Sequence, residues 1–288
     1  MNIYDVSKKA GVSIATVSRV LNGNANVSDK TKNKVLVAMK ELDYTPNIFA
    51  RGLGLNTMKT IGIMCSDSSD TYLANAVYYL EQELRRHNYD SILCCTGQDS
   101  ETKKKYLDLL ISKRVDGIIL AGSQFVLNQP GSDNRYILNA AKEVPIVLAN
   151  GFLPGKNIYS VMCNDTAAVY DATSRLIAAG RRQIVYLYTS TSYSGMNKLK
   201  GYKNALSDAG IPLREEWTHL CTKNIQRAKD YLNTLYDKGI SFDAVVTSDD
   251  SLAWALLNMP MNTGLPFRNS FRLSVTTIPF LPTAPNRN

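Results

Sequence analysis

The chain has 288 residues, which is too long for one typical hydrophobic core, so two or three domains are expected. Its hydrophobic fraction of 44% is ordinary for a globular protein, and its formal net charge is +8. Residues 1–60 hold nine Lys/Arg against four Asp/Glu, whereas the rest of the chain holds 24 against 21. This basic excess at the N-terminus indicates an anionic partner there.

The cysteine and histidine patterns argue against several classes of protein. An odd number of cysteines without CxxC spacing predicts reduced, mostly buried thiols, and neither a disulfide framework nor a metal site. His87 and His219 are the only histidines, so a histidine-based metal site or catalytic triad is not expected. No apolar run is long enough to span a bilayer, and the N-terminus lacks the apolar core of a signal peptide. We therefore expect no cofactor and no membrane association. The cysteines are Cys65, Cys94, Cys95, Cys163 and Cys221.

The first residues predict two short helices around a glycine turn. Asn2 suits the cap of a helix over residues 3–10, and Gly11 ends it because glycine enters the left-handed conformation without steric strain. Ser13 caps a second helix over residues 14–21, with its apolar valines inward.

Ser28 caps a third predicted helix over residues 29–42, whose lysines face outward. Two helices joined by a glycine turn form a common motif. Periodicity and charge alone therefore also allow a small helical bundle that binds a protein.

The order of residues in this region resembles a known family. Residues 5–13, DVSKKAGVS, and residues 16–22, TVSRVLN, are similar to the helix-turn-helix of the lactose/galactose-repressor (LacI/GalR) family of bacterial transcription regulators. Residues 27–28 and 44–47 continue the match. The resemblance implies an all-α DNA-binding head over residues 1–45.

The resemblance also implies roles for individual side chains. Arg19 is the expected bidentate ligand of a guanine, and Ile14 and Ala15 suit contacts to thymine methyl groups. Hydroxyl and lysine side chains suit phosphate contacts, which position the protein without reading sequence. The expected DNA-binding set is Tyr4, Ser13, Ile14, Ala15, Thr16, Ser18, Arg19, Asn22, Ser28, Thr31, Lys34, Asn47, Ala50 and Leu53.

Residues 46–59 resemble the hinge helix and linker of the family. The match implies that Leu53 enters the minor groove at the operator centre and kinks the DNA. Gly52 and Gly54 flank it, and each costs about 1 kcal/mol of helix propensity. That suits a helix that forms only on DNA, or a flexible linker.

From residue 60 onward, strand-like and helical runs alternate, which predicts parallel sheets covered on both faces. The rhythm restarts after residue 151, with a strand over residues 159–163 expected to open a second lobe. We therefore predict one α/β lobe at 60–151, another at 152–258, and a cleft between them. Residues 60–63, 115–119, 179–184 and 201–206 resemble the family's core, which is similar to periplasmic sugar-binding proteins.

Polar residues after the predicted strands are the expected effector ligands. Lys198 stands where the family usually has an arginine, three residues before Gly201, and lysine lacks the bidentate fork of arginine. Taken singly, each carboxylate in this set is as well explained by a helix cap or a solvated loop charge as by a ligand role, whereas their joint position at strand ends favours the ligand role. The expected effector-binding set is Asp67, Asp70, Tyr72, Asn164, Asp165, Lys198, Asp249 and Asp250.

Residues 259–288 depart from the pattern, with five prolines and no Asp or Glu. Read one nucleotide earlier, codons allowed for residues 267–276 can encode Ile-Pro-Lys-Gln-Leu-Ser-Val-Ile-Gly-Tyr, which is close to the family's strand motif. We therefore expect a shift of reading frame near Asn258, or a naturally divergent tail. A shift would leave both lobes incomplete and remove part of the dimer interface.

The expected protein is a cytoplasmic, nucleoid-associated bacterial regulator without catalytic activity. As a homodimer it would repress transcription from a near-palindromic operator in double-stranded DNA, in response to a sugar or sugar derivative. One alternative is a sugar-binding protein that the altered C-terminus leaves without regulatory competence. Another is a binding protein of the periplasmic type, which the basic head disfavours. An α/β enzyme is a weaker alternative, because no GxxxxGK[ST] or GxGxxG loop follows a strand.

Overall fold

The computed structural model describes residues 1–23, 26–45, 57–127, 133–222, 225–257 and 272–275. The chain divides into two compact units. The first comprises residues 1–119 with 139–146, and the second comprises residues 120–138 with 147–288. Three predicted DNA ligands lie outside the described residues, namely Asn47, Ala50 and Leu53.

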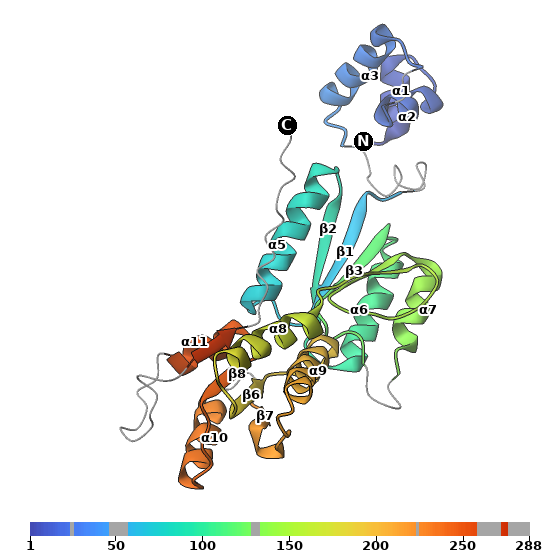
Figure 1. Ribbon diagram of the computed structural model, residues 1–288. Coiled ribbons are helices and arrows are strands. Elements are labelled where there is room, and N and C mark those ends of the chain that lie inside the picture. The colour runs from blue at the N-terminus through green and yellow to red at the C-terminus, as the bar shows by residue number, and fades with distance from the viewer. Residues whose placement is uncertain (24–25, 46–56, 128–132, 223–224, 258–271, 276–288) are drawn as a thin grey trace. The chain divides into compact units, whose positions relative to one another are not determined.

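The N-terminal head is a bundle of α1 (Ile3–Ala10), α2 (Ile14–Leu21) and α3 (Asp29–Glu41), as Figure 1 shows. Val6, Val17 and Val35, one from each helix, are fully buried at its centre. The predicted bounds of the first two helices are confirmed, and the third helix ends one residue before its predicted end.

Local hydrogen bonds explain why the head's helices begin and end where they do. The Asn2 side chain accepts hydrogen bonds from the backbone of Tyr4 and Asp5, and the Asp5 carboxylate accepts one from the backbone N–H of Asn2. Gly11 has a φ of 65°, in the left-handed region that favours glycine, which stops α1. The Ser7 hydroxyl donates to the Val12 carbonyl at 2.6 Å, which holds the turn between α1 and α2.

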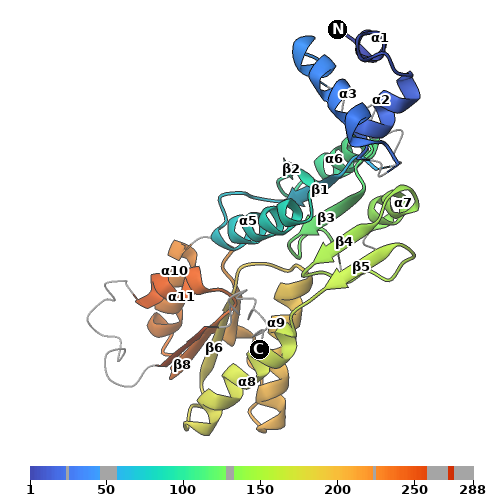
Figure 2. The ribbon, with the colours of Figure 1, turned by 90° about the horizontal axis from the view of Figure 1, so that it is seen from above.

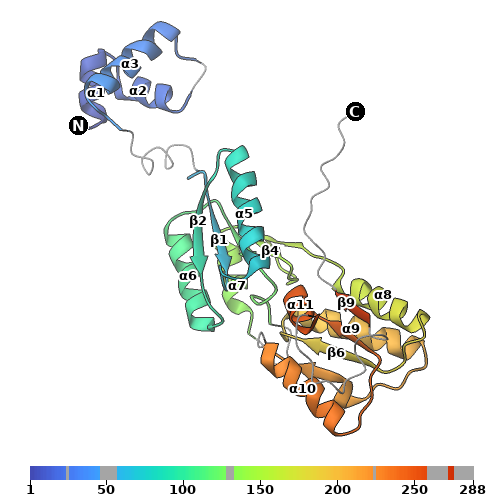
Figure 3. The ribbon, with the colours of Figure 1, turned by 90° about the vertical axis from the view of Figure 1, so that its left-hand side faces the viewer.

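The first sheet has five strands in the order β2-β1-β3-β4-β5. β1 and β2 pair in parallel, with Thr60 opposite Asp90 and Cys65 opposite Cys95. Figure 3 shows α5 and α6 on opposite faces of these strands. A Cβ atom at Gly62 would lie 2.7 Å from a Leu110 methyl group, so the glycine lets α6 approach β1 closely. The elements are β1 (Thr60–Cys65), α5 (Thr71–Arg86), β2 (Asp90–Cys95), α6 (Ser100–Ser112), β3 (Gly117–Ala121), α7 (Arg135–Glu143), β4 (Ile146–Ala149) and β5 (Ile158–Val161).

The strand expected to open the second lobe belongs instead to the first sheet. β5 lies at its edge, beside β4 (Figure 2), and the Asn150 N–H donates to the Val161 carbonyl at 2.7 Å. Its residues alternate between half-buried and exposed. Such alternation is typical of an edge strand, whereas a central strand covered on both faces is apolar throughout. The prediction that residues 159–163 begin the second lobe was therefore wrong.

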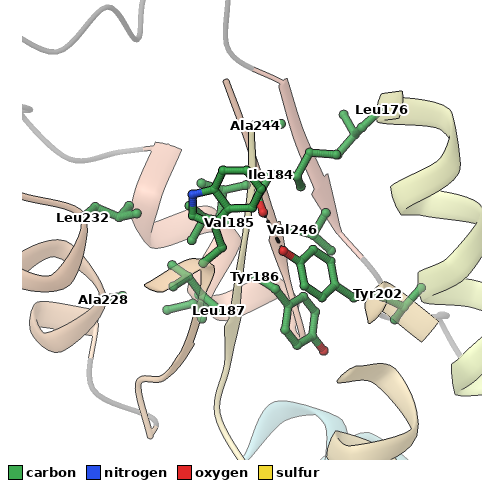
Figure 4. Close-up of a cluster of buried hydrophobic side chains, with 14 of the residues drawn as sticks. Leu176, Ile184, Val185, Tyr186, Leu187, Tyr202, Ala228, Leu232, Ala244 and Val246 are labelled. Atoms are coloured by element: carbon green, nitrogen blue, oxygen red, sulfur yellow. Dashed lines mark hydrogen bonds between the residues drawn. The ribbon is translucent and has the colours of Figure 1, made fainter. Parts of the chain in front are cut away.

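The second sheet has the order β7-β6-β8-β9, and all its pairs are parallel. β6 and β8 are its buried centre. Figure 4 shows the side chains around them, with the Tyr202 hydroxyl donating to the Ile184 carbonyl at 2.7 Å. Tyr202 also stacks on Tyr186, with ring centroids 5.0 Å apart. The elements are α8 (Asp165–Ala178), β6 (Ile184–Tyr188), α9 (Tyr193–Asp208), a 3₁₀ turn (Glu215–Trp217), β7 (Thr218–Leu220), α10 (Ile225–Asp237), β8 (Ala244–Thr247), α11 (Asp250–Leu257) and β9 (Arg272–Val275).

A glycine sets the close packing of α8 against α9. A Cβ atom at Gly201 would collide with the backbone carbonyl oxygen of Thr166 and lie 3.0 Å from the backbone nitrogen of Tyr170. The Thr166 hydroxyl donates to the Asn197 carbonyl at 3.1 Å across the same contact. Gly201 is therefore required by backbone approach, because these backbone atoms cannot rotate away from a side chain.

The C-terminal residues contain a strand that their composition did not predict. β9 pairs with β8 in parallel, with Val245 opposite Leu273 and Thr247 opposite Val275. Its four residues coincide with the Ser-Val-Ile-Gly part of the alternative-frame motif. The expectation that the α/β rhythm ends near Asn258 was therefore wrong for these four residues.

Candidate nucleic-acid interface and effector site

The outward face of α2 presents the predicted base-reading side chains, with Ile14 and Ala15 in its first turn and Arg19 in its last. Ile14, Ala15 and Arg19 are exposed, and Thr16 is half-buried. Ser13 caps the helix by accepting a hydrogen bond from the Thr16 N–H at 3.2 Å, and the hydroxyls of the two residues are 2.9 Å apart. An exposed helix N-terminus with one arginine and small side chains can enter a DNA groove.

The start of α3 repeats this arrangement. Ser28 accepts from the Thr31 N–H at 3.4 Å, and their hydroxyls are 3.0 Å apart. Lys34 is exposed one turn further along α3, and Tyr4 is exposed on α1. Two capped helix N-termini with exposed hydroxyl and lysine groups offer the donors that phosphate oxygens accept.

Two predicted DNA ligands are less open than the others. Ser18 was expected to face outward, and it is half-buried on α2. Asn22 follows the last residue of α2, and its backbone N–H donates to the Ser18 carbonyl at 3.0 Å. Its side-chain oxygen is buried and has no hydrogen-bond partner. The side-chain oxygen of Asn22 is therefore turned away from solvent, although the residue as a whole is half-buried.

Within the first unit, the loop after β1 holds three predicted effector ligands. Asp67 accepts hydrogen bonds from the backbone N–H and the hydroxyl of Ser69, at 2.9 and 2.6 Å. Asp70 caps α5 by accepting from the Leu73 N–H at 3.0 Å. Tyr72 is half-buried in the first turn of that helix. Both carboxylates thus shape the loop.

Within the second unit, polar side chains meet at the carboxyl ends of β6 and β8. The Lys198 Nζ donates to the Ser248 carbonyl at 2.8 Å, and the Thr189 hydroxyl donates to the Asp249 carboxylate at 2.8 Å. We call this set the polar cluster. It comprises Asp165, Thr189, Ser194, Lys198, Ser248 and Asp249.

Asp165 is the most buried carboxylate of the polar cluster, and one of its oxygens has no hydrogen-bond partner. Burial raises its pKa, although a hydrogen bond with Ser194 and the charge of Lys198 oppose that effect. Tyr186 on β6 is fully buried, its hydroxyl also has no partner, and burial and the nearby Asp165 charge raise its pKa. Such unsatisfied groups are rare in folded proteins and mark places where a ligand or water completes the hydrogen bonding.

Several predicted effector ligands also serve as helix caps. Asn164 caps α8 by accepting from the Ala167 N–H at 3.0 Å, and Asp249 caps α11 by accepting from the Leu252 N–H at 3.0 Å. Asp250 is exposed at the first residue of α11. The helix-cap alternative therefore holds for Asp70, Asn164 and Asp249. Asp165 and Lys198 remain as polar groups directed into the polar cluster.

Sequence reasoning missed three members of the polar cluster, namely Thr189, Ser194 and Ser248. A signal was present, because residues 189–194 form a run of hydroxyl side chains directly after β6. The loops after parallel strands face the ligand in such folds, so this run could have been included. Ser248 contributes through its hydroxyl, which accepts from the Thr189 N–H at 3.1 Å, and through its backbone carbonyl, which no side-chain pattern reveals.

In the described parts of the chain, no helix is long and apolar enough to cross a membrane. The same parts hold no group of three or more His, Cys, Asp or Glu placed to bind a metal ion.

Sequence comparison places the two parts of the chain in one family. A family model described as "Bacterial regulatory proteins, lacI family" matches residues 2–47. A second, described as "Periplasmic binding proteins and sugar binding domain of LacI family", matches residues 58–265. The chain belongs to the LacI family of bacterial regulatory proteins. The resemblance inferred from the head and core motifs is thereby confirmed.

Individual relatives agree with this assignment. An HTH-type transcriptional regulator of Lachnoclostridium phytofermentans is 61% identical over 264 residues, covering 92% of this chain and 79% of the relative. Catabolite control protein A of Priestia megaterium is 30% identical over 277 residues, covering 95% of this chain and 81% of the relative. Membership in this family of bacterial regulatory proteins makes the chain a DNA-binding, effector-responsive transcription regulator and not an enzyme.

Solved structures show the same fold. The lac repressor dimer bound to operator and an anti-inducer has a TM-score of 0.78 at 23% identity, covering 95% of this chain and 81% of that chain. A LacI-family regulator from Silicibacter pomeroyi has a TM-score of 0.70 at 25% identity, covering 96% of this chain and 81% of that chain. The predicted fold class, a helical head followed by a two-lobed α/β core, is confirmed.

Proposed function

We propose that this LacI-family regulator is a repressor that binds a near-palindromic operator as a homodimer and responds to a small-molecule effector. The observation that carries the proposal is the exposed start of α2, with Arg19 outward on a head of net positive charge. The lac repressor of similar fold binds its operator as a dimer, which supports the same arrangement here. Two heads related by a two-fold axis read two half-sites, so the operator mirrors that symmetry.

In this proposal the candidate DNA ligands of the head divide into two groups. Arg19 reads a guanine, while Ile14 and Ala15 contact thymine methyl groups. The hydroxyl, amide and lysine groups bind phosphates, which sets the register of α2 in the groove. This second group comprises Tyr4, Ser13, Thr16, Ser18, Asn22, Ser28, Thr31 and Lys34.

We infer that the effector is a neutral sugar or sugar derivative. The polar cluster offers two carboxylates, Asp165 and Asp249, which accept hydrogen bonds from hydroxyl groups. The ammonium of Lys198 is already engaged by the Ser248 carbonyl at 2.8 Å, which limits its value as a partner for an anionic ligand. Asp67, Asp70 and Tyr72 of the first unit and Asn164 and Asp250 of the second complete the proposed effector set.

The remaining assignments extend the family relationship to the whole chain. We assign residues 1–45 to the head and residues 46–59 to the hinge, with Asn47 and Ala50 as DNA ligands and Leu53 as the side chain that enters the minor groove. Of the two lobes predicted at 60–151 and 152–258, the first gains β5 and the second begins after it. Effector binding would change the relation of the lobes and order or disorder the hinge, which couples the two sites. We place the protein in the cytoplasm, on the nucleoid.

A gel-shift salt series tests the DNA-binding part of the proposal. The full chain is bound to a duplex selected from a random pool, and affinity is measured from 50 to 200 mM salt. Six or more phosphate contacts predict a loss of about a thousandfold over that range. A flat response, together with a rise in melting temperature on adding sugars, would support the alternative, a sugar-binding protein without regulatory competence.

We further propose that the reading frame changes near Asn258. The family match ends at residue 265, and the alternative frame restores a strand motif over the residues that form β9. Reading the gene's nucleotides decides the matter. An intact frame with no family motif in the neighbouring frame would show that residues 259–288 are a divergent tail.

A further inference from the structure

Two cysteine thiols lie side by side at the carboxyl ends of β1 and β2. Cys65 and Cys95 are opposite each other in this parallel pair, and their Sγ atoms are 3.7 Å apart. The pairing continues beyond them, because the Thr96 N–H donates to the Cys65 carbonyl at 2.8 Å and the Gly97 N–H donates to the Ser66 carbonyl at 3.0 Å. The backbone that carries the two thiols is therefore held on both sides.

This geometry is close to that of a disulfide. Neighbouring strands lie about 4.8 Å apart, which is within the usual Cα separation of disulfide-linked cysteines. Opposite residues of a parallel pair project their side chains to the same face, so rotation about the side-chain bonds brings the sulfurs to the S–S length of about 2.05 Å. Cys94, the preceding residue of β2, projects to the other face and is buried.

The two thiols differ in their access to solvent. Cys95 is exposed, whereas Cys65 is fully buried. Burial raises the pKa of the Cys65 thiol to about 12, and the hydrogen bond and charge of Cys95 add to that effect. Because the thiolate is the reactive form and must meet its oxidant, Cys95 reacts first and Cys65 second.

We propose that Cys95 and Cys65 form a reversible disulfide when a hydroperoxide oxidises the exposed thiol. The Cys95 sulfur attacks the peroxide, its proton passes to the departing oxygen, and a sulfenic acid and an alcohol or water result. The Cys65 sulfur then attacks the Cys95 sulfur, and hydroxide leaves with the Cys65 proton as water. Two thiols lose two electrons in total, and the hydroperoxide gains them.

The disulfide would act on the loop that holds proposed effector ligands. The backbone N–H of Asp67 donates a hydrogen bond to the Cys65 sulfur. When the bond forms, the Cys65 sulfur moves toward Cys95, from an Sγ–Sγ distance of 3.7 Å to the S–S length of about 2.05 Å, so the Asp67 backbone loses this partner. The link to effector binding rests on the proposed function, whereas formation of the disulfide does not.

Peptide mapping of the full chain tests the chemistry. The reduced protein is treated with hydrogen peroxide, alkylated, digested with trypsin without reductant, and analysed by mass spectrometry. The expected product joins residues 60–85 to residues 87–103, at a mass about 2 Da below the sum of the two peptides, and dithiothreitol removes it. Cys94→Ala keeps this product, and Cys95→Ser abolishes it. A bond between Cys94 and Cys95 within one peptide, or oxidation of Cys95 to sulfinic acid alone, would overturn the proposal.

Hydrogen exchange tests the effect on the loop without any ligand. In the oxidised protein, the Asp67 amide is expected to exchange roughly fivefold faster, which corresponds to the loss of one net hydrogen bond. The amides of α1 to α3 should not change. Unchanged exchange at residues 66–70 in a protein shown to carry the disulfide would overturn the proposed action on the loop, while DNA binding by the head is judged separately.

Discussion

The head and the polar cluster differ in how far apart along the chain their functional side chains lie. In the head, Ser13 to Arg19 share one short helix and its cap, so the same local hydrogen bonds that form α2 also place its proposed DNA ligands. In the polar cluster, Asp165 comes from α8, Lys198 from α9 and Asp249 from the turn before α11, and they meet only because two parallel strands bring their loops together.

The difference determines what a single substitution does in each region. A change on the exposed face of α2 alters a contact but leaves the fold of the head intact, because its core lies on the opposite face of the helix. A change at Asp249 in the polar cluster, or at the neighbouring Asn164, alters both a proposed ligand and the start of a helix, since these residues cap α11 and α8. DNA binding and stability should therefore separate in the head, and effector binding and stability should be coupled in the core.

The largest effect is expected where two helices of the core touch. Gly201→Val places a branched side chain against the backbone of Thr166 and Tyr170, so it should lower the free energy of unfolding by about 3 kcal/mol. Urea unfolding measures this change. Gly210→Ala, at a left-handed position with open space around it, is the control and should cost only about 1 kcal/mol. Equal losses for the two variants would show that α8 and α9 can separate to admit a side chain.

The next effect separates specificity from affinity in the head. Arg19→Ala should lower operator affinity by about 2 kcal/mol, roughly thirtyfold, and relax the preference at one base pair. Lys34→Ala should weaken binding to all sequences alike and flatten the salt dependence, because a phosphate contact carries no sequence information. Binding to a library of operator variants at several salt concentrations measures both. If the two variants behave alike, the division into base-reading and phosphate-binding residues is wrong.

These regions also differ in how well their structure could be predicted from the sequence. The caps Asn2, Ser13 and Ser28 and the turn at Gly11 act within a few residues, so the bounds of α1 and α2 were predicted correctly. The alternation of strand-like and helical runs likewise predicted most strands of both sheets. Which sheet a strand joins is a long-range property, and the assignment of β5 was wrong for that reason.

The candidate effector residues show the same limit. The rule that ligands bind after parallel strands led to Asp165 and Lys198, both of which lie in the polar cluster. The same rule could not predict that Lys198 donates a hydrogen bond to the Ser248 carbonyl, because a backbone atom fifty residues further along the chain does not affect the sequence pattern around Lys198. The thiol pair of Cys65 and Cys95 was missed because the register of two strands decides which side chains meet.

A smaller effect concerns the buried carboxylate of the polar cluster. Burial raises the pKa of Asp165 in the folded protein above its ordinary value of 3.8, so the folded state binds its proton more tightly than the unfolded state. This group therefore favours folding most below pH 3.8, and that contribution is lost as the pH rises through the folded pKa. Asp165→Asn should be more stable than the natural chain at neutral pH, by about 1.5 kcal/mol, while binding sugar more weakly.

The control for this prediction is Asp171→Asn on the same helix. Asp171 is exposed and pairs with Arg175 at 2.8 Å, so its replacement should change stability by no more than about 0.5 kcal/mol. Thermal unfolding of both variants from pH 4 to pH 8 gives the comparison. A gain for Asp165→Asn that is the same at both ends of the range would contradict a charge effect.

The smallest effects come from equivalent cap substitutions in the two regions. Ser28→Ala and Asn164→Ala each remove a side-chain acceptor at a helix N-terminus, and each should cost about 1 kcal/mol of stability. Aspartate restores a cap at either position. Ser28→Asp should therefore recover the stability of the head but still bind DNA weakly, because it puts a negative charge beside a phosphate. Asn164→Asp should recover both stability and sugar binding. Melting temperatures with gel-shift and sugar-titration data measure these outcomes, and DNA binding restored by Ser28→Asp would remove that residue from the phosphate-binding group.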